Sequence, residues 1–206
     1  MKGFFITGTD TNVGKTHIAA MLVRALRRAG ENAIGFKPIC CGPRDDADIL
    51  AAASDLAVND VNPVWLRPPV APYTASMIEG RMVDLALIRE TFARLAAAHT
   101  VIVEGAGGWL VPVERGYSMA DMAIEFALPV IVVTDNRLGC INHTLLTIQA
   151  IHAAGLKCAG IILNHTSTAE DAATVTNRAV LEELAGVPML GEIAHGQTEM
   201  EPLSFT

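Results

Sequence analysis

The sequence predicts an α/β fold in which helices cover both faces of a parallel β-sheet, within a single domain of residues 1–206. Short apolar runs recur along the chain, and each is followed by a polar or glycine-rich break and then a helical pattern. These runs are continuously apolar rather than alternating, which is typical of strands that are buried on both faces. A chain of 206 residues without an internal repeat or a low-complexity linker is expected to form one domain.

The elements follow from these runs in chain order. The expected strands, the last of them weaker, are residues 4–6, 33–36, 101–103, 130–133, 160–163 and 188–190. The first helix is expected from about residue 16 to 29, with apolar residues on one face and Gly30 after its end. Further helices are expected at residues 83–98, 118–127, 142–154 and 169–185. Several prolines between residues 61 and 72 predict an extended surface loop there.

Composition narrows the class of protein. A net charge of −7 argues against general affinity for nucleic acid, which needs clustered cations. No apolar run reaches the roughly 18 residues needed to span a membrane, and the N-terminal segment does not have the pattern of a secretory signal. The four cysteines lack zinc-ligand spacing, which favours free thiols in a reducing compartment. We therefore expect a cytoplasmic enzyme without nucleic-acid or membrane partners.

A glycine-rich loop, GTDTNVGKT at residues 8–16, follows the first strand and opens the first helix. Backbone N–H groups in such a loop converge on phosphate oxygens, and the N-terminus of the helix favours an anion. Lys15 is expected to contact the β- and γ-phosphates of a nucleotide, and the Thr16 hydroxyl is expected to ligate Mg²⁺. Five residues rather than four separate Gly8 from Gly14, so Thr9 stands where a glycine is usual. The loop predicts a P-loop NTPase-like fold.

Ligands of such sheets bind at the carboxyl ends of the strands, where this sequence is unusually polar. Glu104 ends the expected strand 101–103 and is the candidate metal-side acid, because P-loop proteins place a carboxylate there. Asp45, Asp46 and Asp48 follow the second strand, and Asp48 could complete a Mg²⁺ site. Ordinary capping of a helix N-terminus explains these three acids equally well.

Several segments together resemble the dethiobiotin synthetase family, and the likeness runs in order from residue 3 to about 193. The segments are GTDTNVGKT (8–16), GFKP (35–38), Asp48 at the start of a helix, VEGAGGW (103–109), LGCINH (138–143) and LGEI (190–193). The resemblance implies a P-loop α/β homodimer that acts as an ATP- and Mg²⁺-dependent cyclo-ligase of biotin biosynthesis. It would form dethiobiotin from CO₂ and 7,8-diaminononanoate, through a carbamate and a carbamic–phosphoric anhydride, and release ADP and phosphate.

The same resemblance implies roles for individual residues. Catalysis would involve Lys37, which faces the reacting carbamate, together with Lys15 and Thr11. ATP would be bound by Asn12, Val13, Gly14, Lys15, Thr16, His17, Asp48, Glu104, Gly107 and Asn164, the last of these at adenine. Mg²⁺ would be held by Thr16, Asp48 and Glu104. The substrate would be bound by Thr11, Lys37 and Cys41, and its carboxylate tail by Gly139, Cys140, Ile141 and Asn142 from across the dimer interface.

Four residues depart from the family pattern, and other functions of a P-loop protein stay open as alternatives. Asn12 stands where an acidic residue is common, Cys41 and Ala71 replace serines, and Ala194 replaces a proline. A partitioning ATPase would turn over ATP without a substrate, and a small-molecule kinase would give a stable phosphorylated product without bicarbonate. A GTPase is disfavoured because residues 164–167 lack the lysine and aspartate that guanine recognition requires.

Overall fold

The computed structural model describes residues 2–201 and residue 203. Its centre is a six-stranded sheet in the order β10-β9-β8-β1-β5-β2, and every neighbouring pair is parallel. The strands are β1 (Gly3–Gly8), β2 (Ala33–Phe36), β5 (Thr100–Gly108), β8 (Val130–Asp135), β9 (Cys158–Asn164) and β10 (Met189–Ile193). All six expected strands are confirmed, as is their parallel arrangement.

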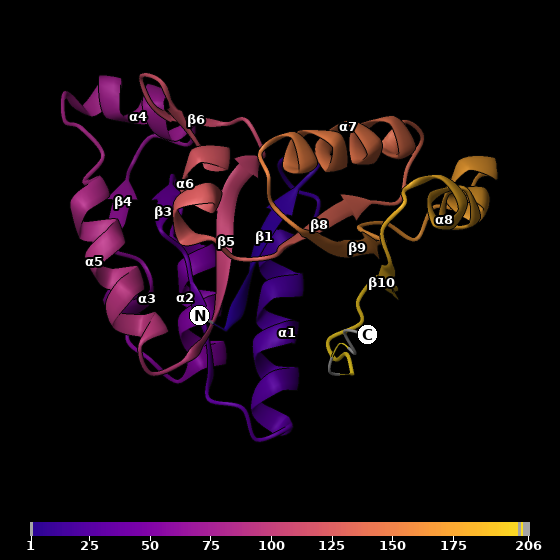
Figure 1. Ribbon diagram of the computed structural model, residues 1–206, viewed down its shortest axis with the longest axis horizontal. Helices are drawn as coiled ribbons and strands as arrows, with labels where there is room; N and C mark the ends of the chain where they lie inside the picture. Colours follow the sequence, from indigo (N-terminus) through magenta and orange to yellow (C-terminus); the bar gives the residue numbers. More distant parts are fainter. Residues whose placement is uncertain (1, 202, 204–206) are drawn as a thin grey trace.

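Helices cover both faces of this sheet (Figure 1). They are α1 (Lys15–Arg28), α2 (Asp45–Ser54), α5 (Leu85–Ala96), α6 (Met119–Phe126), α7 (Cys140–Ala153) and α8 (Ala172–Leu184). The core divides into two layers because successive strand residues point to opposite faces: Phe5 packs with α5, α6 and α7, whereas Ile6 packs with α1 and α2. The continuous apolar runs therefore have the predicted cause, which is burial on both sides. In the part of the chain that the structure describes, no helix is both long and apolar enough to span a bilayer.

Smaller elements lie beside the main sheet. They are β3 (Ile39–Cys41), α3 (Val58–Val61), β4 (Val64–Leu66), α4 (Pro72–Glu79), β6 (Pro112–Glu114) and β7 (Tyr117–Ser118). β3 and β4 form a separate parallel pair. The prediction of a surface loop over residues 61–72 is therefore wrong at residues 64–66, which form β4 with the side chains of Val64 and Leu66 buried. The prolines lie on either side of this short strand rather than within it.

The order of the strands determines where a ligand can bind. The chain runs from β1 to β2 on one side of β1 and from β5 to β8 on the other side, so the direction of the connections reverses between the neighbouring strands β1 and β5. Gly8 is paired with Gly108 on one side and with Val133 on the other. β5 is longer than predicted and continues through Glu104 to Gly108, because the glycine run stays beside β1. The phosphate loop and the Glu104 segment therefore lie next to each other.

Candidate active site

A cavity of about 1050 Å³ lies at these strand ends. Its wall comes from six segments: the phosphate loop with the start of α1, the chain from Lys37 to Pro43, α2, residues 69–72, residues 104–111, and Thr198. Most of the predicted site residues line it, namely Thr11, Asn12, Gly14, Lys15, Thr16, His17, Lys37, Cys41, Glu104 and Gly107. The structure thus brings together residues that lie up to 96 positions apart in the sequence, from Thr11 to Gly107.

The phosphate loop is held in a conformation that requires glycine at one position. Gly14 precedes α1 with φ at 93°, and a Cβ there would lie 2.1 Å from Asn164 Nδ2. Asn164 Nδ2 donates to the carbonyl of Val13 at 3.0 Å, so the end of β9 supports the loop from below. Within the described chain no side chain caps the start of α1, which leaves its first N–H groups available to an anion.

Lys15 lies inside this loop, only 6% exposed, with its Nζ donating to the carbonyl of Asp10 at 2.8 Å. Burial lowers the pKa of Lys15 to about 8, although the charge of Glu104 acts in the opposite direction. A lysine in this state gains charge when phosphate oxygens approach, because an anion favours its protonated form.

Lys37 follows β2 and is 3% exposed. Its Nζ lies 2.5 Å from Glu104 Oε1 and 2.9 Å from Asp46 Oδ2. Burial acts to lower the pKa of Lys37, but the charges of Glu104 and Asp46 outweigh burial and raise it. Burial raises the pKa of Glu104 against the attraction of Lys37, and Lys37 holds the pKa of Asp46 below its usual value despite partial burial. Lys37 therefore remains a cation in the ligand-free protein.

The acid that joins this cluster is Asp46, and the sequence-based assignment of Asp48 to the metal is corrected accordingly. Asp48 is exposed and lies outside the cavity wall in the described chain, whereas Asp46 lines it beside Lys37. Residues two apart on a helix point to nearly opposite sides. Asp46 is one turn before Leu50, whose side chain is buried, so Asp46 lies on the face of α2 that packs against the protein. The spacing of apolar residues in α2 is therefore the sequence signal that distinguishes Asp46 from Asp48.

Thr16, Asp46 and Glu104 fit a Mg²⁺ ion. Thr16 Oγ1 donates to Glu104 Oε1 at 2.8 Å, and Glu104 Oε2 is buried without a hydrogen-bond partner among the described residues. An unpartnered buried carboxylate oxygen is costly unless water or an ion satisfies it. Mg²⁺ takes one or two carboxylates and completes its shell with water and phosphate oxygens. The donors present are therefore of the right kind and number.

Cys41 and Gly107 also line the cavity, from two different segments of the chain. Burial raises the pKa of the Cys41 thiol to about 11, so the thiol is neutral near pH 7. Gly107 has φ at 62°, and a Cβ there would lie 2.7 Å from Val111 Cγ2 and 3.7 Å from Thr11 Oγ1. A side chain at Gly107 would therefore crowd the cavity beside Thr11.

The predicted tail-binding segment lies apart from this cavity. Gly139, with φ at 91°, precedes α7; Cys140 is buried, and none of the four residues 139–142 is in the cavity wall within the described chain. In the described residues no side chain caps the start of α7. The cavity wall of a single chain therefore does not include this segment, although the nearby Arg137 lies 3.7 Å from Asp10 of the phosphate loop.

The C-terminal segment contributes Thr198 to the cavity wall and contacts α1. His17 Nε2 lies 2.6 Å from the carbonyl of Gln197, and the buried Met200 packs against α1. The N–H of Ala194 donates to Gln197 Oε1 at 3.1 Å. A proline has no N–H to donate, so the departure at Ala194 adds a hydrogen bond to this turn.

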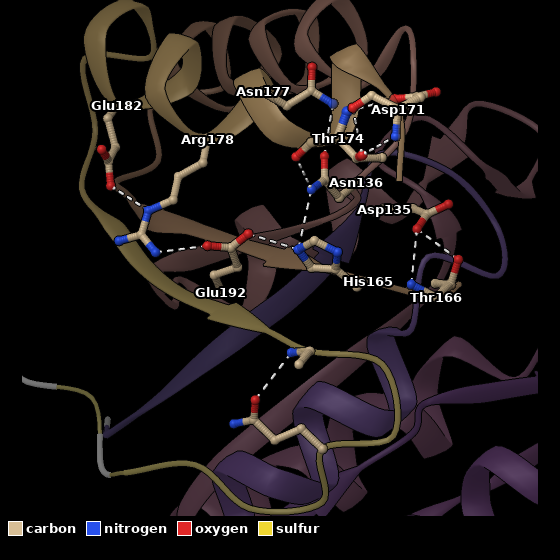
Figure 2. Close-up of polar contacts among 12 residues, drawn as sticks. Asp135, Asn136, His165, Thr166, Asp171, Thr174, Asn177, Arg178, Glu182 and Glu192 are labelled. Atoms are coloured by element: carbon tan, nitrogen blue, oxygen red, sulfur yellow. Dashed lines mark hydrogen bonds and ion pairs between the residues drawn. The ribbon is translucent and has the colours of Figure 1, made fainter. Parts of the chain in front are cut away.

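A polar network lies beside that turn (Figure 2). His165 Nε2 lies 3.2 Å from Asn136 Nδ2 and 2.7 Å from Glu192 Oε1, and Arg178 donates to the other oxygen of Glu192 at 2.8 Å. The network joins α8 to the ends of β8, β9 and β10. It therefore fixes the strand ends on which Asn164 and the turn at Ala194 depend.

Comparisons with known proteins agree with this geometry. A family model described as an AAA domain matches residues 2–200. The chain is 48% identical over 204 residues to ATP-dependent dethiobiotin synthetase BioD of Akkermansia muciniphila, covering 98% of this chain and 96% of the relative. It is 38% identical over 199 residues to the protein of the same name from Bacillus subtilis, covering 93% and 86% of the two chains.

Solved structures agree on the fold. The septum site-determining protein MinD of Pyrococcus horikoshii, in complex with Mg-ADP, matches with a TM-score of 0.57 at 18% identity, over 94% of this chain and 82% of that one. A ParA family ATPase of Chlorobium tepidum matches with a TM-score of 0.55 at 13% identity, over 94% and 84%. These two similarities support the fold alone.

Proposed function

The chain belongs to the family of ATP-dependent dethiobiotin synthetases, and from this premise we propose that it closes a cyclic urea from CO₂ and 7,8-diaminononanoate in biotin biosynthesis. ATP is the co-substrate, and ADP and phosphate are the other products. One observation carries the proposal: a buried lysine outside the phosphate loop, Lys37, lies in the same cavity as the loop itself. ATP hydrolysis alone does not require such a cation, whereas a reaction through an anionic carbamate does.

Lys37 acts first on the diamine and then on its carbamate. Simple alkylamines have pKa values near ~10, so both amines of the free substrate are mostly protonated. Lys37 keeps its charge because its own pKa is raised, and a neighbouring cation favours the neutral, nucleophilic form of an amine. The neutral amine adds to CO₂ and loses a proton, and Lys37 stabilises the resulting carbamate anion.

Lys15 acts on the phosphates. A carbamate oxygen attacks the γ-phosphorus, ADP leaves, and Lys15 offsets the negative charge that is being transferred. The second amine then attacks the carbonyl carbon of the mixed anhydride, the ring closes and inorganic phosphate leaves. Both amines belong to one bound molecule, which corresponds to effective molarities of ~10⁵ M or more. No side chain needs to form a covalent bond.

Mg²⁺ would be held by Thr16, Asp46 and Glu104, and when bound it neutralises charge on the phosphate oxygens. The unpartnered oxygen of Glu104 supports this assignment. We assign adenine to Asn164 and the turn that follows β10, using the atoms of Asn164 that are not engaged by Val13. Thr11 and Cys41 would contact the diamine, which their place in the cavity wall supports.

The working unit we propose is a cytoplasmic homodimer, in which residues 139–142 of one copy bind the substrate carboxylate of the other. The uncapped start of α7 suits a carboxylate, since helix N-termini attract anions. Leu138 precedes this segment and is 78% exposed, as expected of a side chain that a second copy covers. Sedimentation at the assay concentration tests this, and a fully active monomer would contradict it.

The function is tested by incubating the protein with ATP, Mg²⁺, labelled bicarbonate and the diamine. We expect label in a cyclic urea and one ADP per ring. ATP turnover that proceeds equally well when CO₂ is excluded would instead indicate a partitioning ATPase. A stable phosphorylated product without a bicarbonate requirement would indicate a kinase.

A further inference from the structure

The backbone of Lys37 is held from outside the main sheet. β2 ends at Phe36, and Pro38 has no N–H, so the sheet provides no further bonds here. Instead, the N–H of Lys37 donates to the carbonyl of Val61 at 2.8 Å, and the carbonyl of Lys37 accepts from Asn62 Nδ2 at 2.8 Å. The peptide that carries the buried cation therefore depends on two successive residues of a segment 24 positions away.

Asn62 is itself fixed on every side. It is 1% exposed, and its Nδ2 also donates to the carbonyl of Val64 at 3.0 Å. Arg44 Nε donates to Asn62 Oδ1 at 2.8 Å, and Arg44 Nη2 donates to the backbone carbonyl of Asn62 at 2.7 Å. Both hydrogens of the Asn62 amide and its side-chain oxygen are thus engaged, so the amide has one orientation available.

Arg44 also connects this amide to the helix turn that carries Asp46, the acid 2.9 Å from Lys37. Arg44 is the residue before α2, and its carbonyl accepts from the N–H of Ala47 in the first turn, where Asp46 lies. The guanidinium lies 5.4 Å from the ring centroid of Trp65, and Trp65 Nε1 donates to the carbonyl of Gly42 at 2.8 Å. The start of α2 is therefore tied to the segment that holds Lys37.

We propose that Arg44 and Asn62 form a positioning clamp that sets the distance between Lys37 and Asp46. This inference rests on the proposed function, because it assigns the clamp to carbamate formation and phosphoryl transfer. Neither residue of the clamp touches the reacting atoms; Asn62 acts through the backbone of Lys37, and Arg44 acts through Asn62 and α2. An arginine suits this task because two N–H donors of its planar guanidinium hold the side-chain oxygen and the backbone carbonyl of Asn62 in one plane. A lysine ammonium has no such fixed pair of donors.

Asn62→Asp separates the two halves of the clamp. The carboxylate has the same shape and still accepts from Arg44, but it cannot donate to the carbonyls of Lys37 and Val64. We expect kcat for the cyclic urea to fall roughly 100-fold, as for a displacement of about 1 Å at a reacting group. KM for ATP should stay within about threefold and the stoichiometry of nucleotide binding should not change, because the phosphate loop is held by Lys15 and Asn164, which are not part of the clamp.

Arg44→Lys tests the other half without removing charge. It loses the fork to Asn62, and we expect a decrease in kcat of about tenfold with the same unchanged nucleotide binding. Arg89→Lys is the matched control, since Arg89 forms an exposed fork to Glu125, at 2.8 and 2.9 Å, in α5 outside the cavity wall. It should keep the wild-type kcat.

Nucleotide-binding stoichiometry distinguishes positioning from folding. A parallel loss of bound nucleotide and of kcat in both clamp variants would mean that the clamp is only structural, and would overturn the proposal. Wild-type kcat in Asn62→Asp, or in Arg44→Lys if Asn62→Asp does not fold, would also overturn it. Failure of the wild-type protein to form a cyclic urea would instead refute the proposed function.

Discussion

Two buried lysines share one cavity, yet they are held in opposite ways. Lys15 is bonded to a backbone carbonyl within its own loop, and burial lowers its pKa to about 8. Lys37 lies between the carboxylates of Glu104 and Asp46, which raise its pKa although burial opposes them. One lysine can lose its proton at moderately alkaline pH, whereas the other remains charged.

The difference separates a loop half of the site from a cluster half. The loop half consists of residues 8–15, whose shape follows from glycine and from backbone hydrogen bonds. The cluster half consists of Lys37, Asp46, Glu104 and Thr16, whose charges and hydrogen bonds depend on one another. Substitutions in the loop half should change nucleotide affinity, and substitutions in the cluster half should change the chemical step.

The largest expected effect is that of Lys37→Gln. Removal of the cation leaves the carbamate without its stabilising charge, and loss of such a group costs roughly 10²–10³-fold in kcat. Nucleotide binding should remain, because Lys15 and Asn164 hold the phosphate loop through backbone carbonyls and not through Lys37. Product formation and nucleotide titration measure the two effects separately, with Lys15→Gln as the converse variant. Normal turnover in Lys37→Gln would remove this lysine from the mechanism.

A matched pair of substitutions in α2 tests which acid belongs to the cluster. Asp46→Asn removes a partner of Lys37 and a proposed Mg²⁺ ligand, and we expect the Mg²⁺ requirement to rise by about 10–100-fold. Asp48→Asn changes an exposed side chain and should stay within about twofold of the wild type. Mg²⁺ titrations of product formation provide the comparison. The reverse order of effects would restore the sequence-based assignment of Asp48.

The two halves also differ in how far the sequence predicts them. The loop half was predicted residue by residue, because a strand, a glycine-rich turn and the start of a helix are neighbours in the chain. Glu104 was predicted for a similar reason, since it lies on a central apolar strand. Local patterns of this kind determine both the backbone and the place of the side chain.

The cluster half was predicted only in part. Asp46 was missed, since the side of α2 that faces Lys37 depends on how that helix packs on the sheet. The clamp of Arg44 and Asn62 was missed because its two residues lie in segments that local patterns assign to turns and loops. The buried strand β4 was missed for the same reason: three residues between prolines carry too little periodicity to mark a strand.

The pH dependence of ATP binding sharpens the contrast between the lysines. Above pH 8 the ligand-free protein loses the charge on Lys15, so ATP affinity should fall by up to about tenfold per pH unit. In the unfolded chain the pKa of Lys15 is 10.5, so the folded state binds this proton less tightly than the unfolded state does. Lys15 therefore lowers the free energy of unfolding most below pH 8, and this penalty decreases as the pH rises from 8 to 10.5. Nucleotide titrations from pH 7 to 10 measure the binding effect. Lys15→Met should be weak at every pH, and a wild-type affinity that does not change with pH would contradict the assignment.

The smallest expected effect is that of Cys41→Ser, in the cavity wall next to the cluster half. Burial raises the pKa of the thiol to about 11, so both the thiol and its replacement hydroxyl are neutral at pH 7. The substitution therefore leaves the balance among Lys37, Asp46 and Glu104 unchanged, and kcat should stay within about threefold. Any change should appear as a lower KM for the diamine, because a hydroxyl is the better hydrogen-bond partner. Steady-state kinetics with the diamine varied measures both quantities. Complete loss of activity would mean that the cluster half depends on the thiol itself and not on charge alone.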